Sequence, residues 1–558
     1  MLSIKKMFTV LFAASIAVSL FSRELYNDIR VAGENKESPH AFFTISDSFE
    51  SALKPLSCDD VGNIYVGNSY LSLNGDWKFK FVENHEKLDS DVFGKNFDDS
   101  SWRTIPVPST WQTLGYDTIS YTNVYHEFMF DRQGRRLDGF ESKDGKIPEL
   151  IAEPTIVEMH RQAGLYRRTF ELPKDWSGKE VFVKFSAVKS GFKLYVNGSY
   201  VGYSQDSFTP AEFNITKYVK AGKNSISLIV YKYTAGSFLE LQDMPHTMGI
   251  LRDVTLIARP QVFLRDYYAT CNFSDDLKNA DFKCEFTLSN LSGKAQKNLK
   301  IELFLADDKG KLLGDKAIIS KDIPEIAAGK DVTLSGDAKL SNFRLWSPDN
   351  PNLYTLIMRL QNSESKDLEV ARADWGFRKF EIRGNRLYFN NVPFLIKGVN
   401  RHNWSPEGGS VVGLDLMKKD CELIKRANIN AIRTSHYPND EKFYMLCSRY
   451  GLAVLDENNH ETHELRRFLP AENDLFVEPS LVRIRNLVMR DRNVPCVIIW
   501  SLGNESGTYH TKSHKAMEAE ARRIDPTRPI HSEPGAGQES NTSDFVSPMY
   551  GGMGRMQR

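Results

Sequence analysis

One segment of the chain places a carboxyl group directly behind a run of apolar residues. Residues 500–506 have the sequence WSLGNES, and they follow the apolar residues 497–499. A continuous apolar run of this kind is typical of a strand that is buried on both faces, and Glu505 would lie just past its end. A carboxyl group that is partly removed from water keeps its proton near neutral pH and can act as a general acid. Cleavage of a glycosidic bond needs such an acid, with a second carboxylate about 5–5.5 Å away if configuration is retained.

Two further residues could join Glu505 in binding a metal ion. Glu461 and His463 lie two positions apart, so their side chains point to the same side of an extended backbone. Two carboxylates and an imidazole suit an oxygen-preferring divalent ion such as Mg²⁺. The residue types alone leave this open, because a single histidine is more often an ordinary hydrogen-bond partner than a metal ligand.

Other polar side chains follow apolar segments in the same half of the chain. His402, His436, Glu457 and Glu533 each come at or just after a predicted strand. In a barrel of alternating strands and helices, the C-terminal ends of the strands form one rim, so these side chains would meet there. Polar residues are also common at strand ends because loops are solvated. Several imidazoles and carboxylates on one rim nevertheless favour an active site.

The first half of the chain is expected to form two β-sandwiches. Residues 76–81, 180–185 and 193–196 alternate between apolar and polar side chains, and the last of these runs into Asn197-Gly198. This pattern is typical of strands that end in tight turns. It predicts a jelly-roll β-sandwich over residues 66–259. Residues 260–380 continue the same rhythm and predict a smaller, immunoglobulin-like sandwich.

The pattern changes after residue 380 to strands that alternate with helices. The predicted strands are residues 394–399, 431–433, 452–455, 497–500, 529–532 and 545–549. Alternation of this kind predicts a (β/α)8 TIM barrel over residues 381–558. A closed barrel needs eight strands and typically about 250 residues, whereas six strands are found here. We therefore expect an incomplete, C-terminally truncated barrel; the alternative is that two strands escape recognition.

The N-terminus resembles an export signal. Lys5 and Lys6 precede a charge-free apolar run over residues 7–21. This predicts a secretory signal peptide over residues 1–22, because the run is shorter than the ~20 residues that a membrane-spanning helix needs. An uncleaved membrane anchor or a buried helix are the alternatives. We expect a periplasmic or secreted protein that has no membrane segment after signal removal, with residues 23–65 as a leader.

Composition excludes some classes of partner. The chain has 72 Lys and Arg residues and 72 Asp and Glu residues, so its formal net charge is +0. A balanced chain gives no electrostatic reason to expect nucleic acid as a partner. The 6 cysteines form no CxxC or other metal-type spacing. A pair of them could form a disulfide in the periplasm, but the sequence does not indicate which.

Several segments resemble motifs of the bacterial β-galactosidases of glycoside hydrolase family two. In the second half of the chain these are residues 398–402 (GVNRH), 433–439 (RTSHYPN), 456–463 (DENNHETH) and 490–507 (RDRNVPCVIIWSLGNESG). In the first sandwich they are residues 74–77 (NGDW), 201–207 (VGYSQDS) and 242–244 (QDM). The resemblance runs from about residue 65 to the end, and it implies that the first sandwich is the family's sugar-binding domain.

The resemblance also implies roles for the polar residues of the barrel rim. Glu505 resembles the catalytic acid/base and also a Mg²⁺ ligand, and Glu461 and His463 look like the other protein ligands of that ion. These roles agree with the chemistry expected from the residue types alone.

Sugar contacts follow from the same resemblance. His402 and His436 resemble residues that contact the galactosyl ring, and Asn504 resembles the hydrogen-bond partner of its 2-hydroxyl. Asp243 and Asn123 resemble galactose contacts that reach in from the first sandwich. Asp243 also resembles a Na⁺ ligand, which makes Na⁺ a second expected cofactor.

Two departures from the family pattern matter. Pro245 follows Met244 where the family often has Trp, so the galactose pocket is expected to be reshaped there. Tyr550 resembles the tyrosine beside the nucleophile, but the family's nucleophilic Glu lies on barrel strand seven, beyond Tyr550, and no residue here matches it. We expect the complete protein to hydrolyse terminal β-galactosides by retaining double displacement, and this chain alone to be inactive.

Other functions stay open at this stage. The chain could be a non-catalytic galactoside-binding β-sandwich protein, or another family-two glycosidase such as a β-glucuronidase. A separate C-terminal chain could complete the barrel, and a homo-oligomer is possible. The sequence does not indicate whether the galactoside comes from algal, host or plant glycans.

Overall fold

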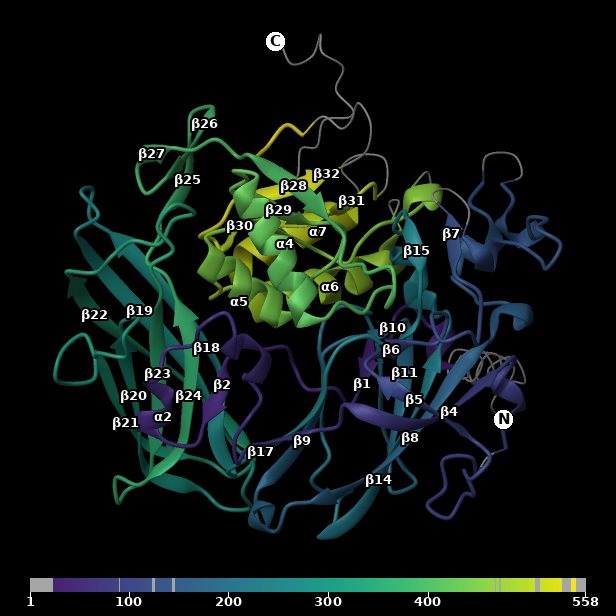
Figure 1. Ribbon diagram of the computed structural model, residues 1–558, viewed down its shortest axis with the longest axis horizontal. Coiled ribbons are helices and arrows are strands. Elements are labelled where there is room, and N and C mark those ends of the chain that lie inside the picture. The colour runs from purple at the N-terminus through teal and green to yellow at the C-terminus, as the bar shows by residue number, and fades with distance from the viewer. Residues whose placement is uncertain are drawn as a thin grey trace, which may run out of the picture.

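The computed structural model describes residues 24–547, apart from residues 90, 123–125, 143–145, 467, 471–472, 507–511 and 534–542. The described residues form two β-sandwiches and, above and between them in Figure 1, a parallel sheet with helices packed on its outside. The expected signal peptide, Asn123 and Tyr550 lie outside the described residues. Within the described part, no helix has the length and apolar character needed to cross a membrane.

The first sandwich packs a seven-stranded sheet, in the order β1-β12-β11-β14-β8-β4-β5, against a four-stranded sheet, β13-β9-β17-β3. The strands are β1 (Gly33–Glu34), β3 (Tyr70–Ser72), β4 (Gly75–Val82), β5 (Arg103–Val107), β8 (Ala163–Leu172), β9 (Glu180–Phe185), β11 (Gly191–Val196), β12 (Ser199–Gln205), β13 (Ala211–Asn214), β14 (Gly222–Tyr231) and β17 (Val254–Arg259). Asn197 and Gly198 have φ of 51° and 83° and join β11 to β12, so the predicted tight turn is confirmed.

Short strands and helical turns extend this sandwich toward the barrel. They are the three-stranded sheet β10 (Val188–Lys189), β16 (Gly249–Ile250) and β6 (Ser109–Thr110), and the ribbon of β7 (Ser120–Thr122) and β15 (Met244–His246). Short helices also occur outside this sandwich: α2 (Phe49–Ala52) packs on the second sandwich, and η2 (Asp60–Asn63), η9 (His463–Leu465) and η10 (Asp474–Phe476) lie with the barrel. Those of the first sandwich are α3 (Glu149–Ala152), η1 (Leu25–Asn27), η3 (His85–Lys87), η4 (Glu127–Met129), η5 (Asp138–Phe140), η6 (Glu158–His160), η7 (Lys174–Trp176) and η8 (Ala235–Leu239). η8 and the β7–β15 ribbon carry the sandwich residues that reach the site described below.

The second sandwich packs the sheet β18-β19-β22 against the sheet β2-β24-β23-β20-β21. Its strands are β2 (Thr44–Ser46), β18 (Val262–Phe273), β19 (Asn279–Asn290), β20 (Gln296–Ala306), β21 (Ile319–Ile326), β22 (Lys330–Ser341), β23 (Tyr354–Gln361) and β24 (Asp367–Trp375). Side chains along β19 alternate between exposed and buried, as expected for a sheet with one solvated face. The segment that we expected to be a leader supplies β1 to the first sandwich and β2 to the second.

The last part of the chain forms a parallel sheet in the order β28-β29-β30-β31-β32. Its strands are β28 (Gly398–Arg401), β29 (Ala431–Thr434), β30 (Ala453–Glu457), β31 (Val497–Asn504) and β32 (Ile530–Glu533). The helices between them are α4 (Leu414–Arg426), α5 (Glu441–Tyr450), α6 (Val477–Asp491) and α7 (Lys512–Ile524), and a hairpin of β25 (Phe380–Arg383), β26 (Arg386–Phe389) and β27 (Val392–Pro393) precedes them. Each of the strands β28 to β31 is followed by a helix that covers one face, which is the arrangement of a TIM barrel.

Two strand predictions differ from the structure. Residues 394–397 lie outside any strand, and β28 begins at Gly398. The apolar side chains of Phe394 and Ile396 pack on the barrel core from a connecting segment, so their hydrophobicity reflects packing rather than strand pairing. The predicted strand 545–549 is not seen over residues 545–547, and residues 548–549 lie outside the described part.

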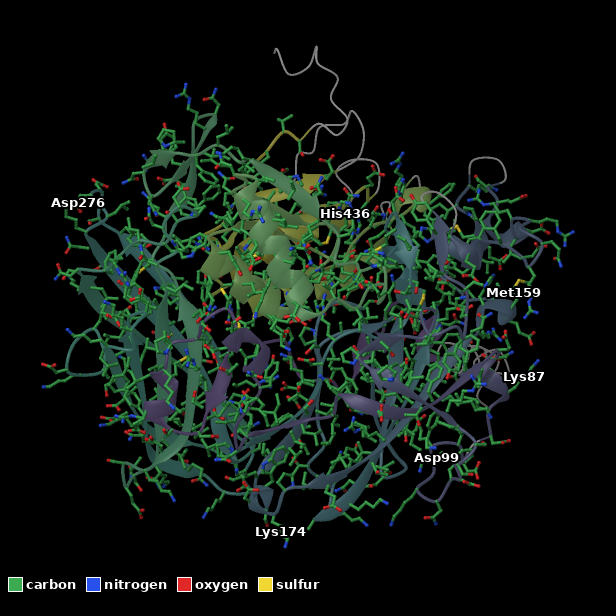
Figure 2. All side chains as sticks on the ribbon, in the orientation of Figure 1. Lys87, Asp99, Met159, Lys174, Asp276 and His436 are labelled. Atoms are coloured by element: carbon green, nitrogen blue, oxygen red, sulfur yellow. The ribbon has the colours of Figure 1, made fainter. Side chains whose placement is uncertain are left out.

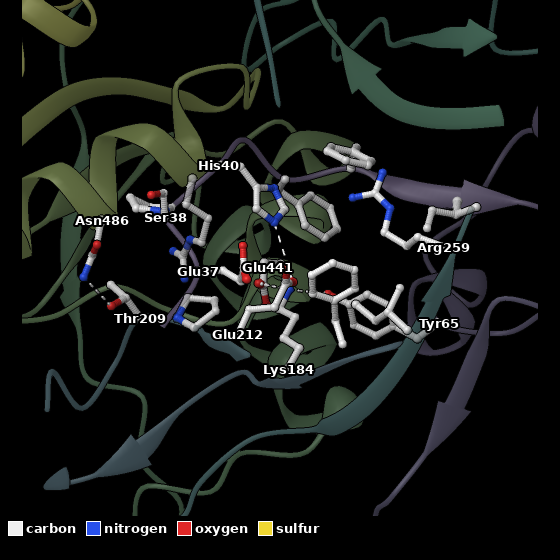
Figure 3. Close-up of a pocket in the computed structure, with 18 of the residues that line it drawn as sticks. Glu37, Ser38, His40, Tyr65, Lys184, Thr209, Glu212, Arg259, Glu441 and Asn486 are labelled. Atoms are coloured by element: carbon white, nitrogen blue, oxygen red, sulfur yellow. Dashed lines mark hydrogen bonds and ion pairs between the residues drawn. The ribbon is translucent and has the colours of Figure 1, made fainter. Parts of the chain in front are cut away.

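An ion pair joins the first sandwich to the barrel. Lys184 of β9 lies 2.7 Å from Glu441 of α5 and donates to the hydroxyl of Tyr65 at 2.8 Å. Figure 3 shows this pair beside a cavity of about 70 Å³, with aromatic rings around it. Because both charges are buried, each depends on the other to offset the cost of leaving water. The pair therefore fixes how the sandwich and the barrel are docked.

Candidate active site

The end of β31 carries the central carboxyl group of the site. Asn504 is the last residue of β31, and Glu505 follows it with a φ of 39°, in the left-handed region that non-glycine residues seldom adopt. The peptide N–H of Glu505 donates to the carbonyl oxygen of Glu533 at 2.8 Å, and the residue is almost fully buried. Backbone strain that is held in place in this way is characteristic of functional positions.

Glu505, Glu461 and His463 come together as expected. One ligand atom from each lies within 4.8 Å of the others, and His463 Nε2 lies 3.1 Å from Glu505 Oε2. Glu461 is fully buried, and neither of its carboxylate oxygens has a hydrogen-bond partner among the described residues. A buried carboxylate without donors is costly, and a divalent cation would satisfy it. The three residues therefore fit a hard divalent ion such as Mg²⁺.

A second set of hydrogen bonds fixes the neighbouring strand ends. Glu457 accepts from Arg433 Nε at 2.5 Å, from the His436 ring at 2.6 Å and from Ser501 Oγ at 2.6 Å. Burial opposes ionisation of Glu457, but the charges of Arg433 and His436 hold its pKa well below the usual range. Arg433 also donates to Asn504 Oδ1 at 3.0 Å, so the orientation of the Asn504 amide is set by the ionised Glu457.

His402 and His436 lie side by side just after the ends of β28 and β29. Their ring centroids are 5.3 Å apart, and His402 Nδ1 lies 3.5 Å from the hydroxyl of Tyr437. Burial, reinforced by His436, lowers the pKa of His402 to about 4, so this imidazole is neutral at pH 7. Both histidines line a cavity of about 780 Å³, and Figure 2 labels His436 in the centre of the molecule. That volume lies in the range of small-molecule sites.

The first sandwich contributes Asp243 to the same region. Tyr121 donates to Asp243 Oδ1 at 3.1 Å from an exposed position, and Tyr121 is directly paired with Pro245 in the β7–β15 ribbon. Gln242, the residue before Asp243, donates from Nε2 to the carbonyl oxygen of His436 at 3.5 Å, so Asp243 lies near the barrel rim. Pro245, the departure from the family pattern, therefore sits opposite an exposed aromatic ring. Asn123, the other expected sandwich contact, lies outside the described residues.

The candidate metal ligand Glu461 is held by backbone hydrogen bonds from the first sandwich. Its N–H donates to the carbonyl oxygen of Leu239 at 2.8 Å, and its carbonyl oxygen accepts from the N–H of Leu241 at 2.9 Å. A parallel bridge also links Glu461 to Asn504. Glu461 thus lies between the sandwich and β31, and its position depends on both.

Asn459 is the centre of the side-chain contacts at this boundary. Its amide nitrogen donates to Asp206 at 2.9 Å and to Glu240 at 2.8 Å, while its oxygen accepts from Gln242 at 2.9 Å. Arg483 of α6 lies 2.9 Å from Glu240 and neutralises it. All these groups are buried, so the network rigidly connects the two domains behind the candidate metal site.

A buried carboxyl group lies behind the rim, on the side of the helices. Asp456 Oδ1 accepts from the hydroxyl of Tyr444 at 2.5 Å, while Oδ2 has no partner among the described residues. Burial, followed by repulsion from Asp491, raises the pKa of Asp456 well above its usual range. Above about pH 4 the unfolded chain has lost this proton while the folded chain keeps it. The stability that Asp456 contributes is therefore lost as pH rises toward its folded pKa.

Replacing Asp456 by Asn should consequently stabilise the protein more at pH 8 than at pH 5. Asn still accepts from Tyr444, and it carries no proton that must be taken up on folding. The change in unfolding free energy relative to the parent should grow by up to about 4 kcal/mol over these three pH units. Urea unfolding at both pH values measures it, with exposed Asp322 replaced by Asn as the control. An equal effect of Asp456→Asn at both pH values would contradict the assignment.

The structure thus brings together Glu505, Glu461, His463, Asn504, His402, His436 and Asp243, and does not describe Asn123 or Tyr550. Sequence reasoning placed Glu457 on the rim without a specific role, and it assigned no role to Arg433 or Asn459. Glu457 and Ser501 are neighbours in register on β30 and β31, so strand alternation would have indicated that they face each other. Nothing in the pattern indicated the contacts of Asn459, because they depend on domain docking.

Models of one family match most of the chain. The model described as Glycosyl hydrolases family 2, TIM barrel domain, matches residues 380–558, the sugar binding domain of the same family matches residues 143–260, and its middle model matches residues 262–378. A β-galactosidase of Pectobacterium atrosepticum is 39% identical over 482 residues, which are 86% of this chain and 44% of that protein. A β-galactosidase of Priestia megaterium is 33% identical over 540 residues, 94% of this chain and 49% of that protein. The chain spans about half the length of the curated relatives it matches.

Solved structures share the fold. A Bacteroides uniformis β-glucuronidase aligns with a TM-score of 0.67 and 22% identity, covering 83% of this chain and 52% of that one. A structure described as a putative β-galactosidase from Bacteroides fragilis aligns with a TM-score of 0.66 and 21% identity, covering 85% of this chain and 66% of that one. At these identities the likeness concerns the fold alone. Taken with the three matching models, it agrees with the arrangement of two sandwiches and a barrel, and the chain belongs to glycosyl hydrolase family 2.

Proposed function

We propose that the whole protein is a retaining β-galactosidase, with Glu505 as its acid/base. The observation that carries this proposal is the convergence of Glu505, Glu461 and His463 behind a cavity lined by His402 and His436. The curated relatives, which are named β-galactosidases, supply the substrate class.

In the proposed reaction Glu505 transfers one proton in each of two steps. Its carboxyl group donates a proton to the glycosidic oxygen as the bond to the anomeric carbon breaks, while a second carboxylate attacks that carbon. Glu505, now ionised, then takes a proton from the water that releases the sugar. The resemblance places the second carboxylate beyond Tyr550. Glu457 does not replace it, because Arg433, His436 and Ser501 occupy its oxygens.

The other site residues bind and orient the sugar in this proposal. Asn504 offers its amide nitrogen to the 2-hydroxyl because its oxygen is held by Arg433. Neutral His402 presents a ring nitrogen to a sugar hydroxyl without attracting a proton at pH 7. Asp243 accepts from hydroxyls on the sandwich side, and it is the residue that we propose as a Na⁺ ligand. We also propose export to the periplasm or beyond, on the strength of the N-terminal signal pattern.

Glu461, His463 and Glu505 would hold Mg²⁺. When bound, the ion supplies positive charge that offsets the two neighbouring carboxylates and stabilises one geometry of the site. Glu461 would contribute its two carboxylate oxygens, neither of which has a hydrogen bond in the described part of the chain, and His463 would contribute the nitrogen that faces Glu505.

Turnover of matched aryl glycosides tests the proposal. The protein purified from its native cell should hydrolyse 4-nitrophenyl β-D-galactoside at least about 100-fold faster, by kcat/KM, than the β-D-glucuronide or β-D-mannoside, since mispaired polar groups in a sugar site cost several kcal/mol. The 558-residue chain produced alone should show no turnover. A preference for the glucuronide would overturn the substrate class, and full activity of the chain alone would overturn the assignment of a nucleophile beyond Tyr550.

A further inference from the structure

The guanidinium group of Arg466 lies beside the candidate metal site, on the side that faces solvent. Arg466 Nη1 lies 2.8 Å from Glu505 Oε2, the same oxygen that His463 Nε2 approaches at 3.1 Å. The side chain of Arg466 is 40% exposed, whereas that of Glu505 is 7% exposed. Arg466 therefore reaches inward from solvent to a buried carboxylate.

The local backbone explains why Arg466 is in this place. η9 spans His463–Leu465, and the N–H of Arg466 donates to the carbonyl oxygen of His463 at 3.1 Å. Residues three apart on such a turn lie on the same side, so His463 and Arg466 both face Glu505. One short turn thus supplies both an expected metal ligand and a cation.

Arg466 and a divalent cation would compete for the negative charge of Glu505. Glu461 and Glu505 are two carboxylates with ligand atoms within 4.8 Å. Arg466 offsets the charge of Glu505, whereas Glu461 has only the imidazole of His463, at 3.6 Å, as an ion-pair partner among the described residues. A divalent cation would offset both, and its charge would replace the positive charge that Arg466 places at Glu505 Oε2. Repulsion between the guanidinium and a dication also disfavours simultaneous close contact.

We propose that Arg466 is an exchangeable internal counter-ion of Glu505 that competes with the divalent cation and sets its affinity. With no cation bound, Arg466 holds the acid/base carboxylate in position. When a cation binds, Arg466 swings out toward solvent, as its exposed position allows. This inference rests on the proposed metal site, but it concerns a residue that is not one of the metal ligands.

Mn²⁺ binding to the full chain tests this, with free Mn²⁺ followed by electron paramagnetic resonance and Mg²⁺ added as competitor. Arg466→Gln should bind Mn²⁺ about ten-fold more tightly, which corresponds to removing a unit charge near a dication in a water-like dielectric. Arg466→Lys keeps the charge and should stay within about two-fold of the parent. Arg485→Gln is the matched control, because Arg485 is 34% exposed and pairs with Glu478 and Glu520, away from the three candidate ligands.

The outcomes separate the inference from the metal site on which it rests. Equal dissociation constants for the parent and Arg466→Gln, with binding lost in Glu461→Gln, would overturn the competition and leave the metal site standing. Tighter binding by both Arg466→Gln and Arg466→Lys would show that loss of the forked contact, rather than of the charge, is responsible, and would overturn competition by charge. No Mn²⁺ binding by the parent or by Arg466→Gln would overturn the metal site and the inference together. A thermal unfolding scan of each variant checks that it is folded.

Discussion

Replacing Glu461 by Gln is expected to weaken divalent-cation binding at least about 100-fold, because the amide removes a full charge from a hard cation's ligand set. Neither oxygen of Glu461 accepts a hydrogen bond among the described residues, whereas Glu505 Oε2 accepts from Arg466, so Glu461 has most to offer an ion. The substitution keeps the shape of the side chain and the backbone contacts to Leu239 and Leu241. Loss of binding would thus report on charge rather than on misfolding.

Titration of the full chain with Mn²⁺, followed by calorimetry, measures this effect. Glu478→Gln serves as the control, because Glu478 lies on the surface of α6 and is largely exposed. Unchanged affinity in Glu461→Gln would show that any bound ion lies elsewhere, and the assignment of Glu461, His463 and Glu505 would be wrong.

Arg483→Met is expected to lower the free energy of unfolding by about 3–5 kcal/mol, because it leaves Glu240 as an uncompensated buried charge. Arg483 is almost fully buried, lies 2.9 Å from Glu240 and also donates to the carbonyl oxygen of Gly236 at 3.1 Å. Glu240 precedes Leu241, whose N–H holds Glu461. We therefore expect the same variant to bind Mn²⁺ more weakly even where it remains folded.

Urea unfolding of single and double variants separates the causes. Arg485→Met, two residues away on α6, removes ion pairs with exposed Glu478 and with half-buried Glu520, and should change the unfolding free energy by only about 1 kcal/mol. Adding Glu240→Gln to Arg483→Met should recover part of the loss, because the charge left unpaired is removed. If the double variant is as unstable as the sum of the two single variants, the ion pair is not the source of the effect.

Local sequence patterns predicted the presence of strands better than the residues at which the strands begin and end. Alternation predicted β4, β9 and β11, and the Asn197-Gly198 pair predicted the turn after β11. Both features are set by neighbours along the chain. The prediction that residues 394–397 belong to a strand was wrong, because their apolar side chains pack on the barrel core without a strand partner. β31 runs four residues beyond the predicted residue 500, so Asn504 is inside the strand rather than after it.

The residues of the candidate site also fall into those that the sequence could predict and those that it could not. Glu505, Glu461 and His463 could be predicted because their residue types and their places after strands restrict their chemistry. Arg466 and Asn459 could not, because their partners lie 39 or more positions away and are met only after folding. Asn459 contacts Asp206 across 253 positions, a separation at which the sequence carries no periodic signal.

The bridge between η8 and the loop after β30 has a consequence for how the protein matures. Glu461 is held by Leu239 and Leu241, more than 200 positions earlier in the chain, so a barrel domain made without the first sandwich lacks one support of its cation site. Closing such a long loop is slow compared with forming a local helix or hairpin. We therefore expect the candidate site to bind a cation only after the domains have docked. The time at which binding appears during refolding would then report when docking occurs.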